Sequence, residues 1–505
     1  MIVTRTQFLR NAVLNWTALF VGLLVPFFLS PFTVHHLGNL AYGIWVLVAS
    51  SVSYFHLLDL GLRNAVITFV SQSRTLGKQE ESRRVVSTAM WLRLGIAVII
   101  LMLAGLIAAW FPHLFSIPYQ LIRAARLAIV FSALSLAVTL TSGVPAAVLA
   151  AVHRYDLLSM VALLRTVLRT AGFVVLVDRG FGIVGLSIWE LVSALVVGLA
   201  YTTACTWLCP ELRKMLPPDR AMIRKLWGYS AYAFLITMGG AVINYTDNGI
   251  VGLFLSPGAV IFYAIAANLI LYSREVISTM SSMFVPVASA FEAGGRTEQL
   301  RNLLVRGTQA SLLLSLPISI VLFVRGETFI TLWMGAEYGS LSGTLLQILL
   351  VNQIFTVANL TSSGIVFGMA KHRPLAMWVL FEAVTNLLLS VILVKRIGIY
   401  GVAWGTALAG VICNLVFWPR YIAKLLQLSL RSYLWKAWGY AALAAVPFGV
   451  ACWYQEHHVQ ANDLVHFFAQ TTAIVPVFVL PAALLFWKKA SPYVLARTEP
   501  VLGTD

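Results

Sequence analysis

The sequence contains few charged residues. Asp, Glu, Lys and Arg make up 11% of its 505 residues, whereas 60% are hydrophobic and the mean hydropathy is +0.86. A soluble domain of this composition could not cover its surface with polar groups. The composition therefore excludes an ordinary soluble protein and indicates an integral membrane protein.

The sequence also lacks the common motifs of enzymes. It has no GxxxxGK phosphate loop, no HExxH, no CxxC, and no GxSxG in a strand-to-helix context. Its few cysteines lie in or beside apolar stretches, without the paired spacing of a disulfide framework. They are Cys205, Cys209, Cys413 and Cys452. We therefore expect a protein that is not an enzyme and that uses no cofactor and no metal.

Long apolar stretches are what the sequence has in abundance. A bilayer-spanning helix needs about 20 apolar residues, and stretches of that length recur between short loops of Gly, Pro, Asp or basic residues. The sequence predicts an all-α fold of fourteen transmembrane helices. The expected spans are 12–33, 42–62, 86–111, 127–150, 157–177, 183–208, 229–255, 259–288, 305–324, 343–369, 374–394, 400–423, 434–454 and 466–487.

Basic residues collect on one side of these spans. If the N-terminus is cytoplasmic, the outer segments hold only Arg123, Arg126, Arg179, Arg325, Lys395 and Arg396 out of 35 Lys and Arg. Basic residues in short loops are retained in the cytoplasm, so both termini are predicted to be cytoplasmic. The net charge of +16 then reflects topology. An RNA-binding surface is the weaker interpretation, because no basic domain stands apart from the spans.

The chain contains an internal repeat. The segment GKQEESRRVV at 77–86 returns 218 positions later as GRTEQLRNLL at 295–304, with the Gly, the basic residue, Glu80 and Arg83 in register. His153 and Arg154 match His372 and Arg373, and FGIVGL at 181–186 matches IGIYGV at 397–402. A repeat of roughly 200 residues in a hydrophobic chain is typical of a two-lobed transporter.

The repeat predicts how the chain is divided. Each lobe holds six spans, an even number, so the lobes enter the membrane in the same orientation and their pseudo-two-fold axis stands along the membrane normal. The expected divisions are an N-terminal lobe (1–210), a cytoplasmic linker (211–228), a C-terminal lobe (229–425), helices 13 and 14 (426–490) and a cytoplasmic tail (491–505).

Ionisable residues inside the spans are the candidate substrate-binding residues, because a charge in the membrane is costly. Arg165 and Arg169 lie four residues apart on one helical face, and at an offset of 217 they fall on Glu382 and Asn386. Arg165 and Glu382 could pair or line a polarised path across a central cavity. Arg274 lies near the middle of the eighth span beside Glu275, which points about 100° away.

Neutral polar groups and further charges complete the set. Asp247 with Asn244 and Asn248 forms a polar patch for a carbohydrate, a coupling cation or a structural network. Asn352, Gln353 and Asn359 could bind sugar or link helices. Arg93, near a span end, could join a cationic entrance. Asp59 and Arg63 have the spacing of a helical ion pair, which favours a structural role.

Several segments resemble the Wzx-type polysaccharide flippases of the multidrug/oligosaccharidyl-lipid/polysaccharide exporter superfamily, to which the multidrug exporters and the lipid II flippase also belong. They are LNWTALFVGLLVPFFLSPF (14–32), LGNLAYGIW (37–45), LDLGLRNAVITFVS (58–71) and the loop with GKQEESRR. The resemblance implies export of an undecaprenyl-pyrophosphate-linked oligosaccharide across the bacterial inner membrane by alternating access, for exopolysaccharide or O-antigen synthesis.

The resemblance also implies a cationic central cavity, which agrees with Arg165, Arg169 and Arg274. Polysaccharide polymerase and co-polymerase proteins are the expected partners besides the lipid substrate and a coupling H⁺ or Na⁺, and no nucleic acid is expected. Helices 13 and 14 could form a groove for the polyprenyl tail.

Three alternatives are kept. A cation-coupled multidrug exporter is disfavoured because the first span has no acidic residue and the deep charges of the N-terminal lobe are arginines. A lipid II flippase would be expected to begin its first span with an Arg-rich motif. A non-transporting partner of a polysaccharide assembly complex is the alternative from a different class.

Overall fold

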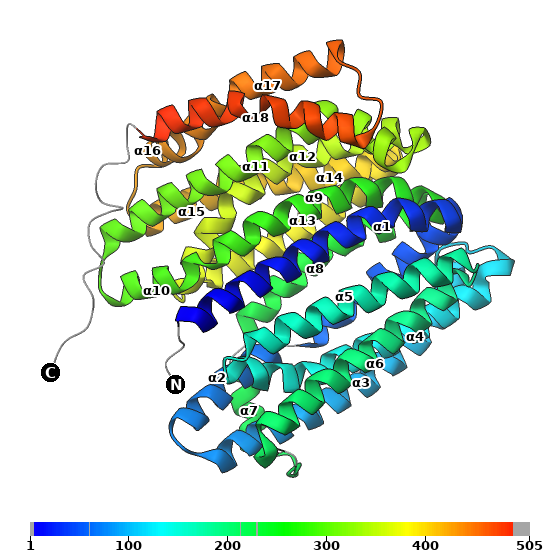
Figure 1. The fold of residues 1–505 in the computed structure, drawn as a ribbon, viewed down its shortest axis with the longest axis vertical. Coiled ribbons are helices and arrows are strands. Elements are labelled where there is room, and N and C mark those ends of the chain that lie inside the picture. Colours follow the sequence, from blue (N-terminus) through cyan, green and yellow to red (C-terminus); the bar gives the residue numbers. More distant parts are fainter. Residues whose placement is uncertain (1–4, 60, 213, 229–230, 488–505) are drawn as a thin grey trace. The chain divides into compact units, whose positions relative to one another are not determined.

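A computed structural model describes residues 5–59, 61–212, 214–228 and 231–487 (Figure 1). These residues form helices and short connections and contain no strand. The expected tail, 491–505, lies outside the described residues. The α-helices are α1 (Arg5–Ser53), α2 (Leu62–Thr75), α3 (Gln79–Leu114), α4 (Tyr119–Ala151), α5 (Tyr155–Asp178), α6 (Gly182–Leu208), α7 (Arg220–Gly228), α8 (Ala231–Phe254), α9 (Val260–Ser282), α10 (Phe284–Ala293), α11 (Thr297–Met334), α12 (Ala336–Gly368), α13 (Arg373–Ile397), α14 (Ile399–Val411), α15 (Trp418–Leu425), α16 (Leu430–Tyr433), α17 (Tyr440–His458) and α18 (Leu464–Trp487).

Short helices of other kinds connect them. Three are 3₁₀ segments, η1 (Tyr54–Asp59), η2 (Pro210–Leu212) and η3 (Pro257–Ala259), and two are π-helical, η4 (Ile412–Phe417) and η5 (Leu434–Gly439).

The prediction of a multi-pass helical membrane protein is confirmed. Eleven helical stretches of the described residues are long and apolar enough to cross a bilayer. One of them, Phe20–Thr75, overlaps the first expected span, 12–33, and contains the second, 42–62. The helix α8 lies within the expected span 229–255, and η5 with α17 covers the expected span 434–454. Within α1, Gly38 separates two helices because its φ of 74° is open to glycine and costly for other residues.

The repeated loop has the same backbone in both copies. Gly77 and Gly295 have φ of 68° and 64°. The next residues donate to carbonyls five positions back, Lys78 to Ser73 and Arg296 to Phe291, each at 2.8 Å. The helices that follow, α3 and α11, have 36 and 38 residues. At 1.5 Å per residue they are about 54 and 57 Å long, so they extend beyond a hydrocarbon core of about 30 Å.

The sequence match of His153 with His372 between the two copies of the repeat is two residues away from the structural match. The residues with left-handed backbone are His153 and Ala370, with φ of 59° and 55°. The following amides, of Arg154 and Lys371, donate to carbonyls five residues back at 2.9 and 3.0 Å. The turn geometry therefore pairs His153 with Ala370, an offset of 217, and not with His372. This is the offset that places Arg165 at the position of Glu382.

The helices group by contact into two compact units. Unit 1 comprises Met1–Ile265 and Arg373–Ala409, and unit 2 comprises Ala266–His372 and Gly410–Asp505. These units group helices by packing and not by repeat, so the division into two six-helix lobes stays a prediction. In unit 1, α5 packs against α1 and α6, and α8 packs against α13. In unit 2, α11 packs against α12 and α17.

Candidate functional site

The candidate site in unit 1 is built on α5. Arg154 precedes the helix and donates to Asp156 in the first turn, Nε to Oδ1 at 2.9 Å and Nη2 to Oδ2 at 3.0 Å. The Asp156 carboxylate also lies near the positive end of the helix dipole, which stabilises the start of α5. Arg165 and Arg169 follow four residues apart and therefore share one face of the helix.

A glycine brings α6 close to this face. A Cβ at Gly172 would lie 1.8 Å from Nε1 of Trp189, so only glycine fits there without movement of the indole. Nε1 of Trp189 donates to the backbone oxygen of Leu168 at 2.8 Å. This close approach places the next residue of α6, Glu190, beside Arg169.

Arg165 and Arg169 line a pocket of about 290 Å³. All of its lining residues belong to unit 1. The other walls come from α1, η1, α4 and α6 and consist of Trp45, Ala49, Val52, Ser53, His56, Ser132, Ser135, Leu136, Thr139 and Glu190. The pocket thus combines two guanidinium groups with one carboxylate, one imidazole and a row of hydroxyl groups.

The two arginines differ in how they are neutralised. Nε of Arg169 lies 2.6 Å from Oε1 of Glu190, a contact of opposite charges without hydrogen-bond alignment, and its guanidinium lies 5.1 Å from the ring centre of Phe173. Arg165 is exposed and forms no ion pair within the described ranges, so the suggested pair with Glu382 is not formed. With His56 neutral, the charges are +2 and −1, which leaves +1 in the pocket.

His56 was missed by sequence reasoning, although the sequence contains a signal for it. Trp45, Ala49, Val52 and His56 recur at spacings of three or four residues, which is the period of one helical face. All four line the pocket. A search for the helical face opposite the arginines would have selected His56 together with Trp45.

Arg93 is not at an open entrance. Its side chain is 2% exposed, and its Nη2 forms an ion pair with Oδ1 of Asp59, which is 33% exposed. Nε and Nη1 of Arg93 have no hydrogen-bond partner among the described residues. The expected helical pair of Asp59 with Arg63 is wrong, because Gly61 adopts a left-handed φ of 70° and interrupts the helix between them.

Asp247 forms a second polar cluster in unit 1. Its Oδ2 accepts hydrogen bonds from the hydroxyls of Tyr263 at 2.5 Å and Thr406 at 2.6 Å. Asn386 donates from Nδ2 to Thr406 at 2.9 Å. These four residues, the Asp247 cluster, come from α8, α9, α13 and α14. Asp247 and Asn386 are 3% and 1% exposed, and the Oδ1 atom of each has no hydrogen-bond partner in the described parts of the chain.

The structure separates Asp247 from the neighbours expected to share its patch. Asn248 donates to Ser50 of α1 at 3.1 Å, and Asn244 donates to the backbone oxygen of Gly240 in its own helix at 2.6 Å. Of the candidate residues, the structure brings Asp247 together with Asn386 and leaves Asn244 and Asn248 outside the cluster.

The candidates in unit 2 are dispersed. Arg274 on α9 is partly buried and is not a free cation, while Glu275 is exposed. Gln353 donates to Ser273 at 3.4 Å, and Asn359 donates to the backbone oxygen of Asn414 at 2.7 Å. Asn414 in turn donates to Asn352 at 3.4 Å. Of the two roles left open for these amides, their contacts are those of residues that link helices.

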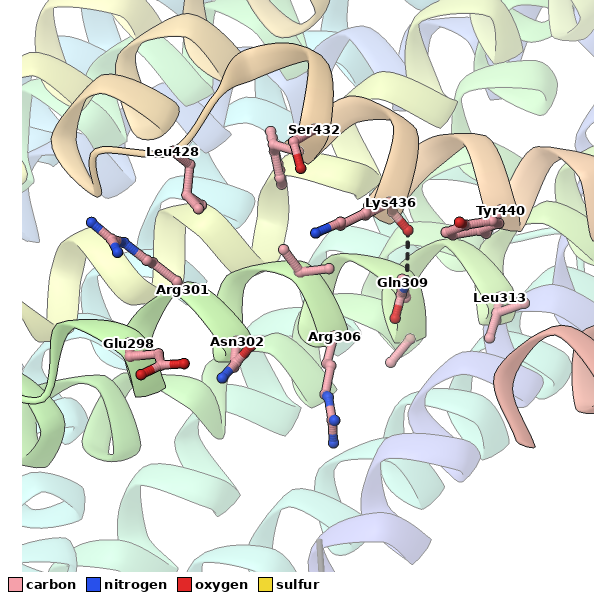
Figure 2. Close-up of a pocket in the computed structure, with 13 residues that line it drawn as sticks. Glu298, Arg301, Asn302, Arg306, Gln309, Leu313, Leu428, Ser432, Lys436 and Tyr440 are labelled. Carbon is pink, nitrogen blue, oxygen red and sulfur yellow. Dashed lines mark hydrogen bonds between the residues drawn. The ribbon is translucent and has the colours of Figure 1, made fainter. Parts of the chain in front are cut away.

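A larger pocket, of about 720 Å³, lies in unit 2 between α11 and the segment 428–440 (Figure 2). It contains none of the candidate substrate-binding residues that the sequence predicted. Three of its four charged lining residues are basic, Arg301, Arg306 and Lys436, and the fourth is Glu298.

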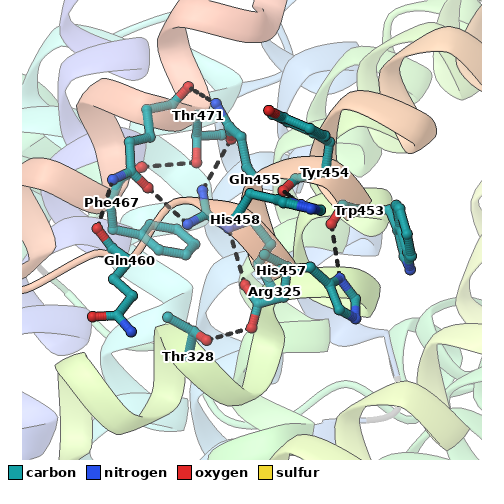
Figure 3. A network of polar contacts seen from close by, with 12 residues as sticks. Arg325, Thr328, Trp453, Tyr454, Gln455, His457, His458, Gln460, Phe467 and Thr471 are labelled. Carbon is teal, nitrogen blue, oxygen red and sulfur yellow. Dashed lines mark hydrogen bonds and ion pairs between the residues drawn. The ribbon is translucent and has the colours of Figure 1, made fainter.

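A third polar cluster in unit 2 surrounds Arg325 (Figure 3). The sequence placed this residue in an outer loop, but α11 continues through it with a local kink, and its side chain is 1% exposed. Its three nitrogens donate to Glu456, Gln455 and Gln470 at 3.2, 3.1 and 2.8 Å. The guanidinium also lies 4.6 Å from the ring centre of Phe467.

Comparison with protein families gives a match over residues 37–343 to the family described as "Polysaccharide biosynthesis protein". The chain is 22% identical over 434 residues to "Uncharacterized membrane protein EpsK" of Bacillus subtilis, with 83% of this chain and 84% of that protein covered. It is 26% identical over 262 residues to "Probable low-salt glycan biosynthesis flippase Agl15" of Haloferax volcanii, covering 50% and 54%.

Two solved structures share the fold. The lipid II flippase MurJ in an inward closed conformation superposes with a TM-score of 0.73 at 13% identity, covering 95% of this chain and 99% of MurJ. An inward-facing MATE family multidrug resistance transporter of the MOP superfamily gives a TM-score of 0.71 at 15% identity, covering 82% and 96%. The predicted fold class is therefore confirmed. These likenesses do not distinguish a lipid-linked sugar from a drug as the substrate.

Proposed function

Since the chain belongs to the polysaccharide biosynthesis protein family, we propose that it is a flippase that moves an undecaprenyl-pyrophosphate-linked oligosaccharide from the cytoplasmic to the periplasmic leaflet of a bacterial inner membrane. The observation that carries this proposal is the pocket of Arg165 and Arg169. Both termini are proposed to be cytoplasmic, and the protein to have no enzymatic activity of its own. Polymerase and co-polymerase proteins are the proposed partners.

The chemistry of the pocket suits a pyrophosphate. Guanidinium groups offer planar pairs of donors that match phosphate oxygens and keep their charge in a membrane. Arg165 is open to such an anion, and Arg169 can exchange Glu190 for it. The hydroxyls of Ser53 and Ser132 line the same space and are of the type that binds sugar. The net positive charge disfavours a cationic drug.

Glu190 has a defined role in this mechanism. When the pocket is empty, the carboxylate neutralises Arg169, and when the anion binds, the ion pair opens. The pocket then gains a second cation for the ligand at little net desolvation cost, since Arg169 is already 42% exposed. An inside-negative potential would favour outward movement of the anionic headgroup by about 2.3 kcal/mol per charge per 100 mV.

The Asp247 cluster is proposed as the site of the coupling cation. The two unpartnered Oδ1 atoms, of Asp247 and Asn386, are hard oxygen ligands of the kind that Na⁺ accepts, and Asp247 can also carry a proton. The cluster joins four helices, so its occupancy can bias how these helices pack during alternating access.

The proposal is tested in cells that make the polymer. Arg165→Ala and Arg169→Ala variants should lose surface polymer while lipid-linked repeat units accumulate on the cytoplasmic side. The matched control is Arg396→Ala, an exposed arginine at the end of α13 outside the pocket. Normal polymer in the Arg165 and Arg169 variants would refute the anion pocket.

A further inference from the structure

The large pocket of unit 2 has a polar end and an apolar end. One wall is the first half of α11, where Glu298, Arg301 and Arg306 precede Ala310 and Leu313. The other wall is the segment 428–440, which passes from α15 through α16 and the π-helical η5 into α17. From Glu298 to Leu313, α11 rises about 22 Å at 1.5 Å per residue. The pocket therefore changes from charged to apolar along the direction of the spans.

The pocket has a net positive charge, and only some of its basic side chains form hydrogen bonds within the protein. Three cations and Glu298 give +3 − 1, or +2. Arg301 is held by the backbone oxygen of Leu426 at 2.7 Å and by Gln427 at 3.4 Å. Arg306 and the ammonium group of Lys436 have no ion pair or side-chain hydrogen bond with any described residue. In Figure 2, Lys436 extends over the pocket toward Leu428, whereas the guanidinium of Arg306 points away from Lys436.

The walls of this pocket are fixed to each other. Gln309 on α11 donates from Nε2 to the backbone oxygen of Lys436 at 2.7 Å (Figure 2). Behind it, the hydroxyls of Thr308 and Tyr433 are 3.3 Å apart in a buried contact. π-helical turns are rare and are frequently found at functional sites, and here one carries Lys436. Lys436 is thus presented by a preformed frame.

An aromatic residue places the polar end at the membrane surface. Trp435 beside Lys436 is 57% exposed. Exposed Trp residues gather at the level of the lipid headgroups. The basic residues of this region predict that this is the cytoplasmic surface, where anionic lipids attract Lys and Arg.

We propose that this pocket binds an anionic glycerophospholipid of the cytoplasmic leaflet, with the phosphodiester at Lys436 and an acyl chain along Ala310, Leu313 and Tyr440. A glycerophospholipid is favoured over the transported lipid because Lys436 offers a point charge to a single phosphodiester. The paired guanidinium groups on α5 offer the bidentate geometry that suits a pyrophosphate. The lipid would link α11 to the segment leading into α17.

Native mass spectrometry of the full chain, titrated with phosphatidylglycerol and separately with phosphatidylcholine of equal chain length, tests this proposal. The wild type should bind phosphatidylglycerol selectively. The Lys436→Gln variant should bind it about fivefold more weakly. An Arg396→Gln variant loses the same charge from an exposed position outside the pocket and should bind as the wild type does.

Three results would overturn the proposal. One is phosphatidylglycerol binding by the Lys436→Gln variant that stays within twofold of the wild type. Another is full displacement of the lipid by inorganic phosphate, which would make the pocket a site for a free anion. The third is a strong preference of the pocket for a polyprenyl pyrophosphate, which would assign it to the transported lipid. Melting temperatures measured without added lipid confirm that the variants are folded, so that a loss of binding reports on the pocket.

Discussion

Two arginines, Arg325 in unit 2 and Arg93 in unit 1, are almost equally buried, at 1% and 2% exposed, but differ in how their nitrogens are used. All three nitrogens of Arg325 donate to side chains, and an aromatic ring covers its face. Arg93 has one charged contact, with Asp59, and two nitrogens without a partner in the described chain.

The difference indicates that Arg325 holds helices together, as a clamp between them, whereas Arg93 is able to change its hydrogen-bond partners. A fully bonded buried guanidinium is fixed, because any rearrangement would leave buried donors unpaired. Arg325 thus fastens α11 to α17 and α18. A buried guanidinium with unpaired donors, such as that of Arg93, already has this cost in the observed structure. Such groups are expected where a structure has to rearrange or bind a ligand. Unit 1, which also holds the arginine pocket and the Asp247 cluster, is therefore the unit where we expect side chains to exchange partners during transport.

The largest expected effect is that of Arg325→Ala. The substitution leaves Glu456 and the two glutamines without their shared cation, and removal of one partner of a buried pair costs about 3 kcal/mol or more. Unfolding in mixed micelles with increasing SDS should show this loss. A stability unchanged from the wild type would mean that the network is not a clamp.

Arg93→Ala should cost less, about 1.5 kcal/mol, because one charged hydrogen bond is lost and Asp59 can be hydrated. The same SDS titration measures it. Flipping should fall more than this stability loss explains, if the two unpartnered nitrogens serve the transport cycle. A stability loss equal to that of Arg325→Ala would remove the distinction between the two arginines.

The smallest expected effect comes from Thr328, at the edge of the Arg325 cluster. Thr328 donates to Oε1 of Glu456 at 2.5 Å, so Thr328→Val keeps the shape and removes one hydrogen bond. We expect a loss of about 1 kcal/mol with flipping unchanged. A defect in flipping at full stability would show that the network takes part in transport.

The sequence predicted the fold class and the repeat well, because both depend on local signals. Gly77 and Gly295 predict the same turn in both copies, and the structure has it. The apolar stretches predict the spans, since membrane helices need only length and hydropathy. Helix ends were less accurate. The hydropathy of the ninth span falls at Arg325, yet α11 continues to Met334 because the partners of Arg325 come from residues 455–470.

Pairing between distant residues was not predictable in the same way. Arg169 contacts Glu190 because Gly172 admits the indole of Trp189, a contact that depends on how α5 and α6 pack. Asp59 was assigned to Arg63 by spacing, but the left-handed Gly61 lies between them and Arg93 takes its place. Charge and spacing identified candidate residues, and packing decided their partners.

The account's central claim is that Arg165 and Arg169 receive the anionic headgroup. Its most direct test is transbilayer movement of a pyrophosphate-linked oligosaccharide lipid in proteoliposomes. The wild type and the Arg179→Gln/Arg396→Gln control should accelerate this movement, and Arg165→Gln/Arg169→Gln should reduce it to the rate of protein-free vesicles. Movement by the Arg165/Arg169 variant at the wild-type rate would contradict the account.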